Sequence, residues 1–556
     1  MIKLSDLQSF DLGKDQERVT PEDAERQHET VDHILEAFFG SSHKRREIQL
    51  LADEVGLGKT FVALAVGHVV LAAVRQQLRG EIFDELARCY KAVVVVTPAG
   101  NHALCDKWHR EVEALRTRCS INNDSTQWFT SKICLSIDDL LQAIQQASDL
   151  RRKTAPVVLI AEAGLFTKRL SDATVRFFTA CLFRWWGNGL QMKDRYHVIR
   201  GLSHTSGSSA WNDGIARVNR GEYEIDLWNW ARQEAFLNAT DHQRDEWESG
   251  IERRLFESIS MNYGTVEEAL HKLERHEGFS ILEDLRQLCR NAPQREPGDR
   301  RTTQYTEYVE QFTRLKSGLR DAYKRLWPYL LQKSLPLVIV DEAHHWRHSA
   351  RQDCKSFCTY LAPFAKRLLL LTATPFQLHR DELMAVLNIS ESTERAIGHE
   401  AVMALRNMRE RLSKTMQESE EAGRAFSKEW GALNEQLSKV DDRLTSISDT
   451  APIISDLTTK TIEGYWKTVN PDEGSKEELN SIPGALRPFF GRALELCRAN
   501  RRLERSMKPL VIRHRRGIGH RRYWIGKEYP PPRPINIRPD QSQLHLTPGQ
   551  VMPPRA

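Results

Sequence analysis

The chain has 556 residues, of which 40% are hydrophobic and 28% charged, and its formal net charge is +5. This length predicts roughly three or four domains, and the apolar content is sufficient for ordinary hydrophobic cores. The nine cysteines form no C-x-x-C pair, which argues against a zinc site and for reduced thiols. Because no apolar run is long enough to span a membrane and no apolar segment marks the N-terminus, we expect a cytoplasmic protein that is neither secreted nor membrane-spanning.

Apolar runs separated by helical patterns indicate the architecture of the first part of the chain. Residues 47–60 predict a short strand, a glycine turn and then a buried helix that begins near Lys59. Further buried strands are predicted from apolar runs at residues 92–97, 157–160, 337–340 and 368–372. Buried strands that alternate with helices predict a parallel α/β sheet. We assign this lobe to residues 1–182 and 336–398.

Residues 183–335 interrupt the sheet pattern and predict a polar, mostly helical insertion. We expect its tryptophans in the core of the insertion, with base stacking as the alternative. These tryptophans are Trp185, Trp186, Trp211, Trp228, Trp230 and Trp247. The last helix carries an apolar stripe, formed by Val309, Phe312, Leu315, Leu319, Tyr323, Leu326, Trp327 and Leu330.

Residues 399–500 predict a helical protrusion. Apolar residues from Phe426 to Ile447 repeat in steps of four and three, which is typical of a heptad seam. We expect a helical hairpin with its turn near Gly423, whose facing helix supplies Val402, Leu405, Leu412 and Met416. A single helix that covers the α/β core is the alternative.

Residues 501–556 begin with a basic stretch and end in a proline-rich tail. The basic stretch is expected to act either as a solvated linker or as a set of phosphate contacts, and the two readings remain open.

Residues 56–60 lie between a predicted strand and a predicted helix, which is the position that a phosphate-binding loop requires. Glycines let backbone N–H groups approach phosphate oxygens, and the helix N-terminus adds a partial positive charge. Lys59 is the candidate ligand of the β- and γ-phosphates, and Thr60 is a candidate ligand of Mg²⁺. Asp53 stands where the general loop pattern has glycine. The candidate nucleotide-binding residues are Gly56, Leu57, Gly58, Lys59 and Thr60.

The sequence Asp-Glu-Ala-His at residues 341–344 directly follows the predicted strand 337–340. An aspartate at the carboxyl end of a buried strand can hold Mg²⁺, directly or through water. The adjacent glutamate can orient and deprotonate an attacking water. Asp341, Glu342 and Lys59 are therefore the candidate catalytic residues, and Asp341 joins Thr60 as a candidate Mg²⁺ ligand.

The sequence Thr-Ala-Thr-Pro at residues 372–375 ends another predicted strand. The hydroxyls of Thr372 and Thr374 can hydrogen-bond the acidic motif and report the state of the nucleotide. With His344 they form the candidate coupling residues. Each motif alone is a weak signal, but the order, spacing and strand placement of the three argue against coincidence.

These three motifs resemble motifs I, II and III of superfamily 2 helicases. The form Asp-Glu-Val-Gly-Leu-Gly-Lys-Thr at residues 53–60 is similar to the Swi/Snf-like branch of DEAH-box type, which includes bacterial phage-defence relatives. The resemblance implies a RecA-like P-loop lobe that binds ATP and Mg²⁺ and drives movement along double-stranded DNA, and a nucleoid-associated location if the source is bacterial. It also implies a second RecA-like lobe that supplies an arginine, from the remainder of the chain or from a partner protein.

The resemblance assigns further residues. The segment from Thr97 to Trp108 is similar to motif Ia, which contacts the nucleic-acid backbone, so Thr97, Asn101 and Lys107 are the candidate nucleic-acid contacts. Gln27 is the candidate glutamine that reads adenine, although it stands farther from the loop than is usual. Residues 509–516 resemble the connector to the second lobe.

Two other functions remain open at this stage. The chain is then either a non-catalytic nucleotide-sensing subunit that recruits a partner, or a helicase directed to RNA. The intact Lys59, Asp341 and Glu342 argue against lost chemistry. Turnover that is stimulated by duplex DNA but not by RNA would separate the three functions.

Overall fold

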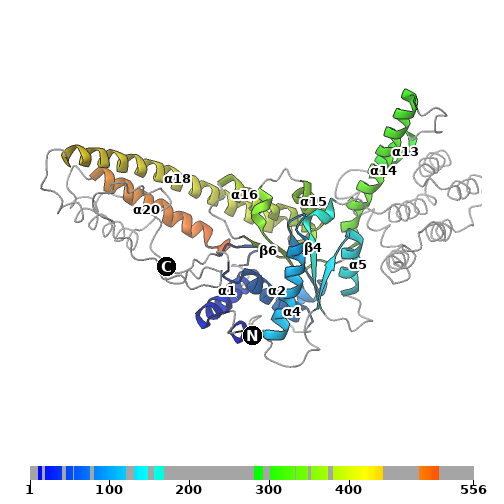
Figure 1. The fold of residues 1–556 in the computed structure, drawn as a ribbon, viewed down its shortest axis with the longest axis horizontal. Helices are drawn as coiled ribbons and strands as arrows, with labels where there is room; N and C mark the ends of the chain where they lie inside the picture. Colours follow the sequence, from blue (N-terminus) through cyan, green and yellow to red (C-terminus); the bar gives the residue numbers. More distant parts are fainter. Residues whose placement is uncertain are drawn as a thin grey trace, which may run out of the picture. The chain divides into compact units, whose positions relative to one another are not determined.

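The structure is a computed structural model that describes residues 10–15, 19–40, 45–53, 56–75, 81–119, 130–147, 156–167, 281–291, 301–331, 333–347, 352–372, 380–441 and 487–512. Its centre is a seven-stranded sheet with the strand order β3-β4-β2-β5-β6-β1-β7 and flanking helices (Figure 1). The predicted α/β class is therefore confirmed. Within the described ranges, a search finds no helix with the length and apolar character needed to span a membrane.

The strands lie where apolar runs predict them, with two exceptions. Their bounds are β1 (Ile48–Leu51), β2 (Ala92–Thr97), β3 (Thr130–Cys134), β4 (Val157–Glu162), β5 (Leu337–Val340), β6 (Leu368–Leu371) and β7 (Val511–Ile512). Strands β2 and β5 are buried along their whole length and pair in parallel with their neighbours, as apolar runs covered on both faces should. The sequence analysis missed β3 and β7, because β3 has a polar, partly exposed sequence and β7 is only two residues long.

Contacts within the chain define two compact units. Unit 1 falls within residues 1–48, 58–371 and 389–399, and unit 2 falls within residues 49–57, 372–388 and 400–556.

Unit 1 contains most of the helices that flank the sheet. They are α1 (Pro21–Phe39), α2 (Lys59–Arg75), α3 (Glu81–Ala87), α4 (His102–Arg118), α5 (Ile137–Ala147), α13 (Ile281–Arg290), α14 (Thr303–Leu330), α15 (Gln352–Tyr360) and α17 (Glu394–Ile397), with short 3-10 helices at Leu12–Lys14, Ala163–Phe166, Ala343–Arg347, Ala362–Phe364 and Asn388–Thr393. Helix α2 is apolar nearly all round and is buried, and its Gly67 faces Val93 of β2 and Ile339 of β5. It begins at Lys59, which confirms the predicted helix start.

The described part of the insertion is the helix pair α13 and α14. Gly318 of α14 lets Leu288 of α13 approach so closely that an added Cβ would lie 2.3 Å from a Leu288 methyl carbon. Of the predicted apolar stripe, Leu315 and Leu326 are buried, whereas Val309 is 41% exposed. The six tryptophans of the insertion lie outside the described residues.

Unit 2 contains α16 (Arg380–Leu387), α18 (His399–Asp441) and α20 (Arg487–Met507). Helix α18 is continuous for 43 residues and passes through Gly423 without a turn, so the predicted hairpin turn is wrong. A glycine inside a helix costs only about 1 kcal/mol relative to alanine, and Gly423 faces Leu496 of the neighbouring α20. The helix therefore continues where the glycine alone favours a break.

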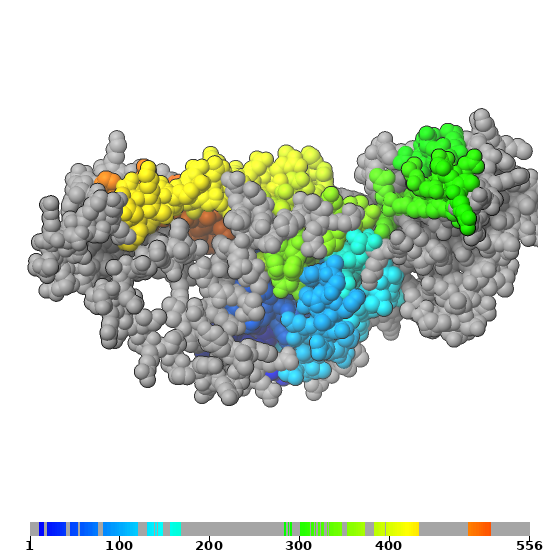
Figure 2. Space-filling view, turned by 45° about the horizontal axis from the view of Figure 1, so that its top comes forward, coloured from blue at the N-terminus to red at the C-terminus, as the bar shows by residue number. Residues whose placement is uncertain are grey.

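The partner of the α18 seam is α20, and the two helices lie side by side (Figures 1 and 2). Phe426 packs on Phe489 with ring centroids 5.3 Å apart. Further toward the start of α18, Ser419 donates to the side-chain oxygen of Asn500 at 2.6 Å. Residue numbers rise along one helix as they fall along the other, so the pair is antiparallel.

After α20 the chain enters strand β7, which pairs in parallel with β1. Leu50 lies opposite Val511, and the side-chain amide of Gln49 donates to the carbonyl of Pro509 at 2.8 Å. The segment that resembles a connector is thus hydrogen-bonded to the strand that leads into the glycine loop.

Candidate nucleotide-binding site

The glycine turn adopts a backbone conformation that glycine alone tolerates readily. Gly56 and Gly58 have φ values of 83° and 84°. Helix α2 begins at Lys59, and the N–H of Val62 donates to the Gly58 carbonyl at 3.0 Å. The first N–H groups of a helix have no partner within the helix, so this turn has the geometry of an anion site.

Gln27 of α1 lies directly against this turn. A Cβ added at Gly58 would lie 2.3 Å from Nε2 of Gln27, so the amide lies close against the glycine backbone, and the φ of +84° at Gly58 further disfavours any other residue. The Gln27 side chain is 3% exposed. The structure therefore brings together Gln27 and the start of the loop helix, as the resemblance implies, although they are far apart in sequence.

Asp341 is held in a fixed orientation at the carboxyl end of β5. Its backbone N–H donates to the carbonyl of Val96 on β2 at 2.9 Å. Oδ1 accepts from the backbone N–H of Glu342 at 2.9 Å, and Oδ2 accepts from Nε1 of Trp108 at 2.7 Å. Burial raises the pKa of the Asp341 carboxyl, and the hydrogen bond from Trp108 opposes this shift.

Glu342 has a strained backbone. Its φ is 48°, and no other non-glycine residue of the described ranges has a positive φ. Such conformations cost of the order of 1–3 kcal/mol and occur preferentially at functional sites. The side chain is 35% exposed, so it reaches solvent as a group that acts on water must.

His344 and Lys59 both act on the Glu342 carboxylate. Nδ1 of His344 lies 3.2 Å from Glu342 Oε2. The contact with His344 is the main cause that lowers the pKa of Glu342, and the charge of Lys59 lowers it further. Lys59 of the loop helix and Glu342 of the acidic motif are therefore close enough for their charges to interact, and Glu342 is held ionised at neutral pH.

These residues fit a magnesium-bound nucleotide. Each oxygen of Asp341 accepts one hydrogen bond, which leaves a second lone pair on each for a metal or its water. Thr60 is half-exposed in the first turn of α2. The described residues contain no group of three or more His, Cys, Asp or Glu side chains that could hold a metal. Mg²⁺ commonly takes one or two protein carboxylates and completes its shell with phosphate and water, so this sparse ligand set suits it.

The candidate nucleic-acid contacts divide into one buried and two exposed residues. Thr97 is fully buried and its hydroxyl lies 3.2 Å from Sγ of Cys105, so its side chain cannot touch a phosphate in this conformation. This burial follows because β2 is covered on both faces, and a nucleic-acid contact at Thr97 stays a prediction. Asn101 and Lys107 are exposed, and the charge of Lys107 acts on Asp341.

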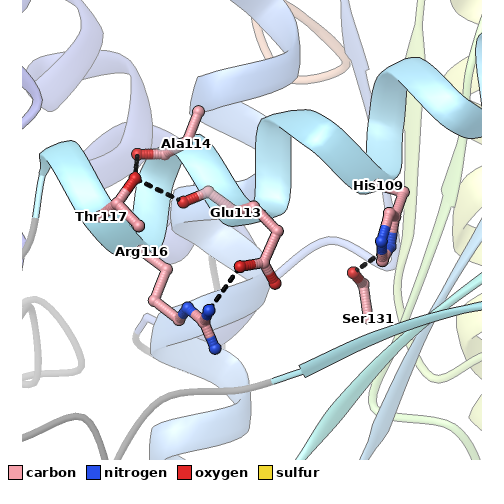
Figure 3. Close-up of polar contacts among 6 residues, drawn as sticks. All are labelled: His109, Glu113, Ala114, Arg116, Thr117 and Ser131. Carbon is pink, nitrogen blue, oxygen red and sulfur yellow. Dashed lines mark hydrogen bonds and ion pairs between the residues drawn. The ribbon is translucent and has the colours of Figure 1, made fainter.

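Polar contacts at its start and near its middle fix the helix that carries Lys107 and Trp108. Near its start, Nδ1 of His102 lies 2.6 Å from Oε1 of Glu162. Farther along, Nδ1 of His109 lies 2.7 Å from the hydroxyl of Ser131 on β3 (Figure 3). Helix α4 is therefore tied to the two neighbouring strands β4 and β3.

The last motif is described only in part. Thr372 is 1% exposed, and its backbone N–H donates to the carbonyl of Leu51 at 3.0 Å. Thr374 lies outside the described residues. The role of the two hydroxyls in coupling thus stays a prediction, whereas His344 does lie against Glu342.

Sequence reasoning missed the contact between Trp108 and Asp341. The resemblance placed Trp108 in a nucleic-acid segment, but its side chain is fully buried. A buried indole N–H needs an acceptor, and α4 starts beside strands whose carboxyl ends carry acidic residues. The need of the Trp108 indole for an acceptor is the sequence signal from which a contact with an acidic residue at a strand end could have been predicted.

No family model matches the chain, and a comparison with curated proteins finds none that is similar to it.

Proposed function

We propose that this chain is the ATP-binding half of an ATP-dependent motor that moves along double-stranded DNA. The proposal includes a RecA-like P-loop lobe and a second lobe that supplies a catalytic arginine, from the rest of a longer chain or from a partner. The observation that carries it is the geometry of the glycine turn, in which Gly56 and Gly58 have positive φ values and helix α2 begins at Lys59 directly afterwards, because this geometry supports a phosphate-binding turn.

Each residue has a stated role in the proposal. The N–H groups at the start of α2 and the Lys59 ammonium bind the phosphates. Gln27, packed on Gly58, contacts the base. Thr60 and Asp341 would hold Mg²⁺, which supplies charge neutralisation on the phosphates when bound. Glu342, held ionised by His344 and Lys59, orients the attacking water and accepts its proton.

Nucleotide binding tests the first half of the proposal. We expect the full chain to bind a fluorescent ATP analogue in the presence of Mg²⁺, and we expect Lys59→Ala to lose this binding. Lys355→Ala, at an exposed lysine on α15, is the matched control and should bind like the parent protein. If the parent and Lys59→Ala bind equally, the turn is not a phosphate site.

The rate of ATP hydrolysis tests the second half of the proposal, which is movement along double-stranded DNA. Duplex DNA should stimulate ATP hydrolysis, and RNA should not. Without an arginine from a second lobe, the stimulated rate should be lower by on the order of 10³ to 10⁵. Stimulation by RNA alone would move the proposal to an RNA track, and nucleotide binding without any turnover in the two-lobed protein would favour a sensing subunit.

A further inference from the structure

Trp108 contacts Asp341 of the acidic motif, and this contact is separate from the glycine turn that is proposed to bind phosphate. The indole is fully buried in α4, and its Nε1–H donates to Oδ2 of Asp341 at 2.7 Å. Hydrogen bonds to a carboxylate are shorter and stronger than neutral ones, and this one is formed away from water. The bond therefore restrains the carboxylate rather than only filling the indole's need for an acceptor.

The two hydrogen bonds of Asp341 come from different elements. The Glu342 N–H belongs to the same turn as Asp341 and moves with it. The Trp108 indole belongs to α4, which is anchored independently by the bond between His109 and Ser131 (Figure 3). Rotation of the carboxylate about its Cβ–Cγ bond would break the Trp108 bond. Trp108 thus selects which lone pairs of Asp341 face away from the core.

We propose that Trp108 is a positioning residue of the magnesium site: it fixes the Asp341 carboxylate in the orientation that receives the metal of a bound metal–nucleotide. The inference rests on the proposed function, since it assigns Asp341 to the metal. Groups that hydrogen-bond a metal ligand from outside typically contribute 10- to 100-fold to metal affinity. Trp108 is expected to contribute within that range.

A second buried tryptophan provides a matched control. Trp346 is 1% exposed and lies in the 3-10 helix that follows the acidic motif, with its ring 4.6 Å from that of Phe357. Its Nε1 has no hydrogen-bond partner within the described residues. Trp→Phe at either position removes the same atoms from a buried site, but only at position 108 does it remove a bond to Asp341.

The test measures metal binding directly with Mn²⁺ as the probe. The free Mn²⁺ signal in electron paramagnetic resonance is titrated against the full chain with ADP, for the parent, Trp108→Phe and Trp346→Phe. We expect Trp108→Phe to bind Mn²⁺ with an affinity that is lower than that of the parent protein by about 10-fold or more. Trp346→Phe should bind as the parent does, although both variants should lower the midpoint of thermal unfolding.

An isosteric replacement removes the N–H without removing the ring. Benzothienylalanine, whose sulfur replaces the indole N–H, is placed at position 108 by genetic code expansion, so that a folded protein is obtained even if Trp108→Phe unfolds. Weakened Mn²⁺ binding in this protein supports the positioning role. Parent-like Mn²⁺ binding in it means that Trp108 serves packing alone and overturns the inference, whereas absence of Mn²⁺–ADP binding in the parent overturns the proposed function as well.

Discussion

The neighbours of Glu342 hold this proposed catalytic carboxylate in its ionised form. A carboxyl half-removed from water tends toward the neutral form, but the His344 contact and the Lys59 charge outweigh that tendency and lower its pKa. Asp341, next to it, experiences the opposite balance, because burial dominates and raises its pKa. The two adjacent carboxyl groups therefore have pKa values shifted in opposite directions, because burial dominates at Asp341 and the His344 contact dominates at Glu342.

Glu342→Gln separates binding from chemistry. The amide cannot accept the proton of the attacking water, but Lys59 and Asp341 remain in place. We expect nucleotide affinity close to that of the parent and turnover that is lower by roughly 10² to 10⁴ in the two-lobed protein. Binding is measured by fluorescence and turnover by phosphate release. Parent-like turnover in Glu342→Gln would remove this residue from the role of base.

His68 makes a pH-dependent contribution to stability. It is 4% exposed in α2, its ring meets that of Phe10 edge-on at 5.5 Å, and burial lowers its pKa to about 4. The unfolded chain takes up a proton below a pKa of 6.5, and the folded chain does so only near 4, so stability is lost as pH falls through this window. Between pH 7 and pH 5 the loss should be about 2 kcal/mol at most.

Denaturant unfolding at several pH values measures this loss. His68→Leu keeps an apolar side chain in the core and should flatten the pH dependence by the predicted amount. His33→Leu, at an exposed position of α1, is the control and should leave the slope of the parent unchanged. An equal slope in the parent and in His68→Leu would assign the pH dependence to other groups.

At the residue scale the sequence predicts those site residues that form contiguous motifs. Asp341 and Glu342 directly follow the apolar strand β5, and Lys59 begins the helix that follows β1 and the glycine turn, so strand placement brings them to one edge of the sheet. The Trp108 contact joins residues far apart in sequence, and no local pattern encodes such a contact. The burial of Thr97 is also not visible in a local motif, because a strand's last residue is buried only when both faces of the strand are covered.

At the scale of elements, α18 and α20 form an antiparallel pair whose core is aromatic. Phe426, Phe489 and Phe490 are nearly buried, with Ala493 and Leu496 beside them. Arg502 donates to a carboxylate oxygen of Glu418 at 3.1 Å near the other end of the pair. Of the predicted seam, Phe426 and Trp430 lie on the face of α18 that packs against α20, and the prediction stays open for the later seam residues, whose side chains lie outside the described part of the chain. Periodicity describes only a face and not its partner. The partner lies beyond a long segment of sequence, and so the hairpin was placed wrongly.

Phe426→Ala should loosen this helix pair. Removing a buried aromatic ring costs roughly 3–5 kcal/mol, and Phe426 is 6% exposed among three other rings. Hydrogen exchange of α20 should therefore accelerate. The control is Gly431→Ala on the same helix, where an added Cβ meets nothing within 4 Å. That change should stabilise α18 by about 0.5–1 kcal/mol. Unchanged exchange in Phe426→Ala would mean that the aromatic cluster does not hold α20.

At the scale of the whole molecule, the net charge of +5 is a weaker indication of where a nucleic acid binds than the positions of individual charged residues. Lys107 is exposed on α4, in the helix that follows the carboxyl end of β2, and its charge acts on Asp341. Arg88 is equally exposed but precedes β2, so it lies toward the opposite edge of the sheet. The two cations thus mark opposite ends of one strand, and only the first is near the proposed catalytic residues.

Charge reversal at these two positions tests where the track binds. Each phosphate contact to duplex DNA contributes about 0.9 to the slope of log affinity against log salt. Lys107→Glu should therefore lower the magnitude of that slope by about 0.9 or more and weaken binding irrespective of DNA sequence, because phosphates carry no base identity. Arg88→Glu should change neither quantity beyond a small general effect of charge.

Affinities are measured by fluorescence anisotropy without nucleotide, so that the influence of Lys107 on Asp341 does not enter. Equal slopes in the two variants would place the track elsewhere on the protein, and the basic residues beyond Ile512 would then be the next positions to reverse.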